Sequence, residues 1–543
     1  MKNLNAQAIL TLGLLIGISI TGVAQHKVLH SNKRTILAIE GNVRQDWTIT
    51  PRLNPDVLPL YDAVAKVKKV KFVSDIDSVE FTVKVNKPVD FIVLYKDDTA
   101  YTRISFTNQI PNTISMTDKL LSLSMFWSEA RYNFAFYDQL TFDWDSLYKS
   151  YIPVMMQSKN DLDYSELMNK FIGSLQDAHS TFASVNYHYP YCDYLGMMVK
   201  YFDDTLRIVR VDSTLINIYP LGSKIVKING LDANDYMDKY VNPYVVSRFK
   251  PTQQELAAYN LVSAKPLDNK ITITCITPQG KIITNTPARD GKKSGHPFTG
   301  KEYDYDSELI HISWIKETNI AVLTINTFAY NQIIDYFERH KDTLYTADGI
   351  IIDIRNNGGG STLIAKHFLN YIIKDSFYLT YGYDTRINNG VKRANGNYVK
   401  HNEDFYKMRA YQSFDPDTVY IEDSVKRFDC PIVILTSSNT VSAAEDFLIM
   451  LYERSDRPLF IGSPSFGSTG SPLVIWDWPV HDSYARVCTR RVRFPYSKKP
   501  FLEGITPDIW VKYSFEEYMS GIDKDMEVAV QELQKQIDAK QPK

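Results

Sequence analysis

Two segments that lie far apart in the sequence share one design, a short apolar run followed by small residues. The first reads DGIIIDIRNNGGG over residues 348–360, and the second reads PIVILTSSNTVSAAE over residues 431–445. Each apolar run is typical of a strand buried on both faces of a largely parallel sheet. A helical pattern follows each turn, over residues 363–373 and 443–452. Both segments are therefore expected to be strand–turn–helix units.

The two turns contain residue types that can take part in catalysis. A glycine-rich turn after a strand exposes backbone N–H groups, because glycine lets the chain turn sharply and approach a ligand closely. A serine at a helix start, here Ser442, places its hydroxyl where the helix N-terminus favours negative charge. Taken singly, the glycines are more often an ordinary loop and the serine an N-cap. Together and in this order, they predict an oxyanion hole and a nucleophile.

This pairing resembles the C-terminal processing, or tail-specific, family of serine peptidases, which includes tricorn protease and retinoid-binding relatives. The resemblance extends over about residues 120–511 and is most specific in DIRNNGGG and TVSAAE. It implies a catalytic α/β core of the ClpP/crotonase type, a PDZ-like domain before it, and peptides or proteins as substrates.

The loop after the nucleophile departs from the pattern of many family members. Where they carry a catalytic lysine this chain has Ser468, and Pro472 replaces the glutamine that usually follows. A serine hydroxyl cannot serve as the base that a lysine amine provides, so a serine–lysine dyad is excluded. Ser468 is accordingly expected to tolerate alanine with only a modest change in rate.

The tricorn-like branch of the family uses a histidine base, helped by a glutamate that follows the nucleophile. His179, at the end of a helical stretch, is the candidate base, since an imidazole is a competent base at neutral pH. Glu503, just before GITPD, is the candidate that orients it. Tricorn has a serine directly before its histidine, whereas Ala178 stands here. Asp177 and Ser180 are therefore the alternative links to the imidazole.

Two further residues have weaker claims to a place in the site. His188, in the sequence YHY, is a second histidine candidate. Glu445 lies one helical turn after the nucleophile, where it either caps the helix or binds a substrate amine, and capping is favoured.

These residues predict acyl transfer. Ser442 attacks a peptide carbonyl while His179 takes its proton, and the backbone N–H groups of Gly359 and Ala443 hold the oxyanion. Water then hydrolyses the acyl-enzyme. No metal or cofactor is implied, because His and Cys lack ligand spacing, and no Gly-x-Ser-x-Gly elbow of an α/β-hydrolase occurs. The alternative is a catalytically inactive periplasmic protein of the same fold that binds peptides or hydrophobic ligands, which the missing lysine keeps open.

Composition and the first residues indicate where the chain works. With 44% hydrophobic residues and a formal net charge of −2, nothing points to nucleic acid or a membrane surface as a partner. Residues 1–24 read as a signal peptide with Lys2, an apolar core and a small-residue cleavage site. No later segment is apolar enough to span a membrane. The protein is therefore expected to be periplasmic or secreted.

The chain is expected to be an α+β protein of several domains, and these domains position the site. The four cysteines are too scattered for a disulfide scaffold and are expected to be buried packing residues. The C-terminal helix is charged and is expected to be a solvated surface helix. After the signal peptide the expected order is a β-sandwich-like domain (25–114), a helical module (115–190), the PDZ-like domain (191–290), the catalytic core (300–513) and the C-terminal helix (514–543).

Overall fold

The computed structural model describes residues 112–540 except 185–191, 267–268, 292–295, 302–306 and 481–482, together with the backbone of eight earlier strands. Those strands are β1 (Leu29–Ser31), β2 (Arg34–Ile36), β3 (Ile39–Gly41), β4 (Trp47–Ile49), β5 (Ala65–Phe72), β6 (Val79–Val85), β7 (Asp90–Lys96) and β8 (Thr99–Ser105). They pair antiparallel in the orders β1-β2, β3-β7-β8 and β4-β6-β5. The packing of these sheets into a sandwich, and the signal peptide, lie outside the described residues.

Three helices form the module that leads to His179. They are α1 (Met116–Asn133), α2 (Trp144–Met156) and α3 (Asp161–Gly173), with the short η1 (Tyr137–Gln139) between the first two. Each helix begins at an N-cap residue whose side chain accepts a backbone N–H; these residues are Ser115, Asp143 and Asn160. Their core also takes in the sheet β28-β29-β9, made of β28 (Pro472–Ile475), β29 (Ser483–Cys488) and β9 (Thr181–Ser184). Strand β9, which follows His179, is thereby paired with β29, which follows Ser468 in the sequence.

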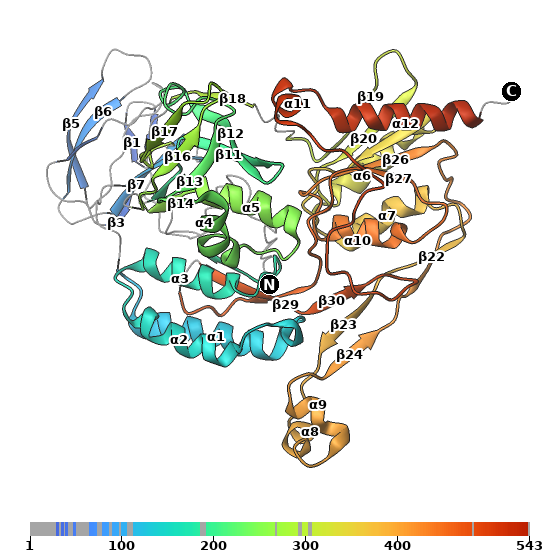
Figure 1. Cartoon of the computed structure of the whole chain (residues 1–543), viewed down its shortest axis with the longest axis horizontal. Helices are drawn as coiled ribbons and strands as arrows, with labels where there is room; N and C mark the ends of the chain where they lie inside the picture. The colour runs from blue at the N-terminus through green and yellow to red at the C-terminus, as the bar shows by residue number, and fades with distance from the viewer. Residues whose placement is uncertain are drawn as a thin grey trace.

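A seven-stranded antiparallel sheet occupies the region where the PDZ-like domain is expected (Figure 1). Its main path is β11 (Met197–Phe202), β12 (Thr205–Asp212), β13 (Lys224–Ile228), β16 (Ile273–Ile276) and β17 (Ile282–Asn285), with β14 (Leu231–Asp232) and β18 (Phe298–Gly300) at its sides. The accompanying elements are α4 (Ala233–Tyr240), η2 (Asn242–Tyr244), α5 (Lys250–Val262) and the pair β10 (Cys192–Asp193) and β15 (Lys265–Pro266). Because β18 pairs with β12, this domain reaches residue 300.

The catalytic core is built on a six-stranded sheet of order β19-β20-β21-β26-β27-β31. The strands are β19 (Ile310–Trp314), β20 (Ile320–Ile325), β21 (Gly349–Asp353), β26 (Ile432–Thr436), β27 (Leu459–Gly462) and β31 (Ile509–Trp510). All neighbours run parallel except β19 and β20. Every residue of β21 and β26 is buried, and the two strands are direct neighbours. The two strand–turn–helix units therefore end side by side, as their sequences predict.

Helices cover both faces of this sheet. One face carries α6 (Gln332–Leu344), α7 (Thr362–Ile372) and α10 (Ala443–Tyr452). The other is covered by α12 (Lys524–Lys540), which buries Ala529, Leu533 and Ile537 against the strands (Figure 1). The expectation that this charged helix is merely solvated is therefore wrong. Its apolar residues recur every four positions and form one buried stripe.

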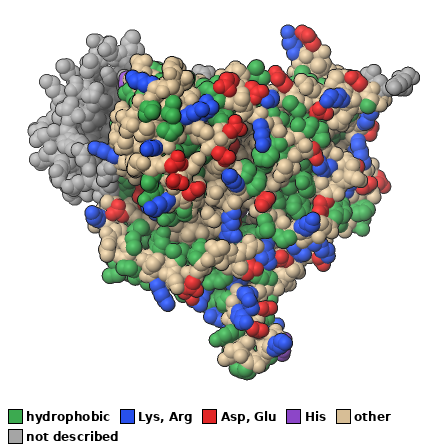
Figure 2. All heavy atoms as spheres, viewed as in Figure 1, with side chains coloured by type: hydrophobic (Ala, Val, Ile, Leu, Met, Phe, Trp, Pro, Cys, Tyr) green, Lys and Arg blue, Asp and Glu red, His purple; other side chains and the backbone are tan. Residues whose placement is uncertain are grey.

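The remaining elements form an arm and a short connector. The arm, made of β23 (Gly382–Arg386), α8 (Gly390–Asn395), η3 (Lys400–Asn402), α9 (Glu403–Tyr406) and β24 (Tyr411–Phe414), projects from the body in Figures 1 and 2. At its base lie β22 (Phe377–Leu379), β25 (Thr418–Tyr420) and β30 (Arg490–Arg493). The connector α11 (Phe515–Ser520) packs Phe515 and Tyr518 on Phe202 of β11. Figure 2 shows charges of both signs interspersed over the visible face.

Two expectations on the whole chain can be compared with the structure. All four cysteines are free thiols, and Cys192, Cys275 and Cys488 are buried while Cys430 is partly buried, which confirms their role in packing. Within the described part of the chain, no helix combines the length and apolar character that a membrane crossing needs.

Candidate active site

Ser442 is the N-cap of α10 and has an unusual backbone, with φ 60° and ψ −120°. This conformation suits glycine, and a residue with a side chain pays about 1–3 kcal/mol to adopt it. Such strain persists only where the surroundings fix it, and it is a known feature of serine nucleophiles on strand-to-helix turns. The Ser442 N–H is fixed by the backbone oxygen of Ser468 at 3.1 Å and by Oε2 of Glu445 at 3.2 Å.

The imidazole of His179 contacts two serine hydroxyls. Its Nε2 lies 3.1 Å from Oγ of Ser442, and its Nδ1 lies 2.8 Å from Oγ of Ser468. If Nδ1 carries the proton and donates it to Ser468, then Nε2 is free to accept the proton of Ser442. That tautomer is the one a general base requires. The structure thus joins Ser442 and His179, which are 263 positions apart in the sequence.

The environment of His179 keeps the imidazole neutral. The side chain is 2% exposed. Burial, reinforced by the positive charges of Arg486 and Arg490, lowers the pKa of His179 to about 3. A histidine that remains unprotonated at neutral pH is available to accept a proton.

Asp177 and Ser180, which lie close to His179 in the sequence, accept hydrogen bonds from backbone N–H groups. Oδ1 of Asp177 accepts the His179 N–H at 3.0 Å, and Oγ of Ser180 accepts the N–H of Cys488 at 3.0 Å. Neither residue therefore supplies the link to the imidazole that the sequence left open between them. The ring's second partner is Ser468, the residue at the position of the family's lysine.

Glu503 does not orient His179 in this structure. Its side chain is exposed and makes no hydrogen bond or ion pair with the described residues, whereas Nδ1 of the imidazole is occupied by Ser468. The segment around Glu503 contributes through its backbone. The N–H of Ile505 donates to Oγ of Ser465 at 2.7 Å, and the N–H of Ser465 donates to the oxygen of Ile505 at 3.0 Å.

The glycine turn lies against the nucleophile. A Cβ added to Gly359, whose φ is 93°, would come within 2.7 Å of Cβ of Ser442 and 3.0 Å of the Ala443 nitrogen. Only glycine therefore leaves space beside the N–H of Ala443, where an oxyanion could form. The N–H of Gly359, however, donates to Oδ1 of Asn357 at 2.9 Å. The predicted oxyanion role of this amide does not fit that contact.

Glu445 is fully buried and faces four donors. Its carboxylate accepts from the N–H groups of Ser442, Gly467 and Ser468 and from the hydroxyl of Ser465, at 2.6–3.2 Å. Burial raises the pKa of Glu445 to about 8 even though the hydrogen bonds from the four donors favour the charged form and lower it. The predicted capping of α10 is present, and the contacts with residues 465–468 extend beyond it.

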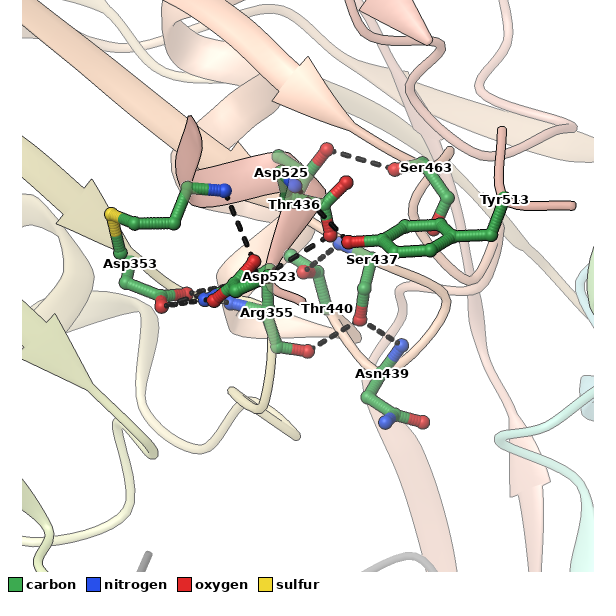
Figure 3. A network of polar contacts seen from close by, with 11 residues as sticks. Asp353, Arg355, Thr436, Ser437, Asn439, Thr440, Ser463, Tyr513, Asp523 and Asp525 are labelled. Atoms are coloured by element: carbon green, nitrogen blue, oxygen red, sulfur yellow. Dashed lines mark hydrogen bonds and ion pairs between the residues drawn. The ribbon is translucent and has the colours of Figure 1, made fainter. Parts of the chain in front are cut away.

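A polar network joins the segments that precede the two turns (Figure 3). The guanidinium of Arg355 contacts the carboxylates of Asp353 and Asp523, each at 2.7 Å. The backbone oxygen of Arg355 accepts the hydroxyl of Ser437, and Oγ1 of Thr440 donates to the oxygen of Ile354 at 2.9 Å. The glycine turn, the nucleophile loop and the start of α12 are therefore joined through one arginine.

The other candidates add no second centre. His188 lies outside the described residues. Among the residues that are described, no group of three or more His, Cys, Asp or Glu side chains could hold a metal ion.

A strained serine at a helix start, in contact with a buried neutral imidazole and beside an open amide, defines a serine hydrolase site. Residues 319–511 match the model of peptidase family S41. The part of the chain that carries Gly359 and Ser442 is therefore that of a serine peptidase similar to family S41. The matched residues include Gly359, Ser442 and Ser468, and His179 lies before them.

Solved structures align with much of the chain at low sequence identity, and one of them, mature CPAF, shares its fold. Mature CPAF complexed with lactacystin is 14% identical, with a TM-score of 0.55, and the match covers 77% of this chain and 99% of that chain. A putative peptidase from Parabacteroides merdae is 17% identical, with a TM-score of 0.44 and coverages of 78% and 97%. Tricorn protease is 12% identical, with a TM-score of 0.38 and coverages of 87% and 42%. No curated protein matches the chain in sequence.

The sequence predicted Ser442 and His179 as site residues, and the structure places them in contact, but two other contacts were missed. Ser468 was treated only as a lost lysine, and Glu445 was considered for capping, which was favoured, or for binding of a substrate amine, but not for contacts with the loop at residues 465–468. The position of Ser468 was itself a signal, because a residue aligned with a catalytic lysine is expected to lie within the site, where its hydroxyl contacts His179.

Proposed function

We propose that this protein is an exported endopeptidase in which Ser442 forms the acyl-enzyme and His179 is the general base. The observation that carries the proposal is the 3.1 Å contact between Nε2 of His179 and Oγ of Ser442. With Nδ1 protonated and held by Ser468, the imidazole accepts the serine proton as the hydroxyl attacks a peptide carbonyl.

The remaining steps follow from the same geometry. The proton passes from Nε2 to the leaving amine, and a water molecule later gives its proton to Nε2 and releases the peptide acid. The Ala443 N–H, with an amide of the glycine turn, stabilises the oxyanion formed in both halves of the reaction.

The test is labelling by a fluorophosphonate probe combined with turnover of an unstructured protein substrate. The wild-type protein should be labelled at Ser442 and should cleave the substrate. Ser442→Ala should abolish both, and His179→Ala should reduce both by several orders of magnitude, since the two residues act as one unit. Labelling of another serine, or full turnover by His179→Ala, would refute the assignment.

The seven-stranded domain supports a further part of the proposal, which is capture of the substrate's C-terminus in a PDZ-like manner. Strand β11 is at one edge of the sheet and packs beside α5, so that an extended peptide could add to this edge. Peptides ending in a free carboxylate should then inhibit turnover more strongly than the same peptides amidated at their C-terminus. Equal inhibition by both forms would argue against this part alone.

Export is the last part of the proposal and rests on the predicted signal peptide. A periplasmic or secreted location requires removal of residues 1–24, which N-terminal sequencing of the purified protein would establish. An intact N-terminus on the active protein would contradict export by this route.

A further inference from the structure

The carboxylate of Glu445 has no part in the mechanism above, although it contacts the backbone of both Ser442 and Ser468. Its Oε2 accepts the N–H of Ser442 at 3.2 Å and that of Ser468 at 2.9 Å. Its Oε1 accepts the hydroxyl of Ser465 and the N–H of Gly467, both at 2.6 Å. One buried side chain therefore joins the nucleophile to the loop that carries the partner of His179.

We infer that Glu445 is a positioning residue that fixes the nucleophile, Ser442, relative to Ser468, the serine that orients the base. The inference rests on the proposed function, because it assigns Glu445 a part in the reaction of Ser442 and His179.

The four partners of Glu445 are all donors. Three are backbone N–H groups, and the fourth is the hydroxyl of Ser465, whose oxygen already accepts the N–H of Ile505 at 2.7 Å. Each carboxylate oxygen of Glu445 faces a backbone N–H group, which can only donate, so the contacts require an acceptor on both sides, as the ionised form supplies, although burial raises the pKa of the group. A glutamine amide accepts on one side and donates on the other. Glutamine would therefore turn an N–H₂ group toward N–H or O–H donors. The isosteric replacement should disrupt the contacts while it preserves the volume.

The strained backbone of Ser442 makes this contact important for reactivity. A conformation at φ 60° and ψ −120° holds only if neighbouring groups fix it, and the Ser442 N–H has two acceptors, Glu445 and the backbone of Ser468. Loss of the carboxylate removes the first acceptor. It also weakens the second, because the Ser468 N–H loses its own acceptor and the backbone of Ser468 is held less firmly. Displacement of a reacting group by about 1 Å can cost roughly 100-fold in rate.

The same contact explains how a serine can stand at position 468. Its hydroxyl is short and uncharged, so its position depends on the backbone of its own loop. Glu445 holds the loop at Gly467 and Ser468, and the neighbouring Asp446 holds it at the hydroxyl of Thr469 at 2.7 Å. Two adjacent side chains of α10 thus place the partner of the imidazole.

The experiment compares Glu445→Gln with the wild-type protein, and Asp161→Asn is the matched control. Asp161 is also fully buried and accepts the N–H groups of Thr113 and Ile114, but it belongs to α3 in the helical module. Glu445→Gln should lower kcat and the rate of fluorophosphonate labelling by at least about 100-fold, with KM within threefold. Asp161→Asn should lose thermal stability yet keep its labelling rate within threefold.

Each outcome separates the possibilities. If the wild-type protein is not labelled, the proposed function fails, whereas labelling of the wild type and of Glu445→Gln at equal rates overturns only the inference. Comparable loss of labelling in Asp161→Asn would mean that any buried carboxylate matters and would also overturn it. Should Glu445→Gln not fold, Ser465→Ala removes one donor and keeps the carboxylate. A fall in kcat of about three- to tenfold at unchanged KM then supports the inference, and an unchanged kcat refutes it.

Discussion

At the scale of the residue, Ser442 combines a reactive hydroxyl with a backbone that favours glycine. The two properties can be separated by substitution. Ser442→Ala and Ser442→Gly should both abolish turnover, but glycine relieves a strain of about 1–3 kcal/mol and pays about 0.5–1 kcal/mol for its freedom in the unfolded chain. Chemical denaturation should therefore show Ser442→Gly to be about 1 kcal/mol more stable than Ser442→Ala. A less stable glycine variant would mean that the turn is not strained.

The lowered pKa of His179 changes the pH dependence expected of a free imidazole. The pKa in the folded protein is about 3, so turnover should not fall as the pH passes through about 6.5, the ordinary value for histidine. The decline due to His179 should begin only at much lower pH. Arg490→Met removes one of the two cations that contribute to the shift and should move the decline to higher pH. A wild-type decline centred near 6.5 would show that His179 is not held neutral.

The same shift has a consequence for stability. The pKa of His179 is lower in the folded than in the unfolded chain, so between about 3 and 6.5 the unfolded chain binds more protons. The free energy of unfolding should therefore decrease as the pH falls below about 6.5. Replacement by asparagine should flatten this part of the curve, which denaturation at several pH values can measure.

Ser468 should matter more than the sequence suggested. Its hydroxyl is the partner of Nδ1 of His179 at 2.8 Å, and an imidazole without that partner can turn or adopt the wrong tautomer. We expect Ser468→Ala to lower kcat by roughly 10–100-fold, less than the ~10⁴-fold known for loss of a carboxylate partner. Glu503→Gln, tested beside it, should be silent because that side chain is exposed. A silent Ser468→Ala with a damaging Glu503→Gln would restore the predicted carboxylate.

How much of the site could be predicted from the sequence depends on how far apart the interacting residues lie in the chain. Ser442 and Gly359 follow buried strands and stand out within their own segments. The contact between His179 and Ser468 joins residues 289 positions apart, and no local pattern reports it. The N–H of Gly359 turns to Asn357 because of a φ of 93°, which the letters GGG do not specify. The residue types at the ends of the two strands could therefore be predicted from the sequence, whereas the partner of each hydrogen bond could not.

At the scale of the element, α12 shows how a charged sequence can hide a buried face. The helix carries many Lys, Glu and Asp residues, yet Leu533 is fully buried on the sheet. Gly349 of β21 makes the approach possible, since an added Cβ would come within 2.9 Å of Leu533. The stripe at residues 529, 533 and 537 has the helical spacing that separates a packed helix from a solvated one.

The stability of the core should depend on that stripe. Leu533→Ala leaves a cavity between α12 and the strands and should cost about 2–5 kcal/mol of unfolding free energy. Lys535→Ala changes an exposed position of the same helix and should stay within about 0.5 kcal/mol. Denaturant titration of both variants is the measurement. A small effect of Leu533→Ala would mean that the helix is only loosely attached.

At the scale of the whole molecule, the connector α11 joins the seven-stranded domain to the catalytic sheet. Phe515 meets Phe202 of β11 at a ring distance of 5.6 Å, and Arg207 lies over the Phe515 ring. A few residues later, Asp523 binds Arg355 behind the glycine turn (Figure 3). The position of the domain and the support of the active site are therefore linked through one short segment.

Removal of the aromatic contact should loosen that link. Phe515→Ala should lower the free energy of unfolding by about 1–3 kcal/mol, since the ring is only partly buried. It should also speed limited proteolysis between the domain and the core. Ile522→Ala, at an exposed position beyond the connector, is the control and should leave the cleavage pattern unchanged. An unaltered pattern in Phe515→Ala would show that other contacts hold the domain.

The covering of the catalytic sheet by α12 also bears on the time at which the chain becomes active during its own synthesis. The helix follows His179, Ser442 and Ser468 in the sequence, and the ribosome makes it after all of them. Until it emerges, one apolar face of β21 and β26 lacks its cover, and Arg355 lacks its partner Asp523. We expect the exported chain to be inert toward its neighbours until this helix has also crossed the membrane and docked, so that the order of the sequence itself delays proteolysis.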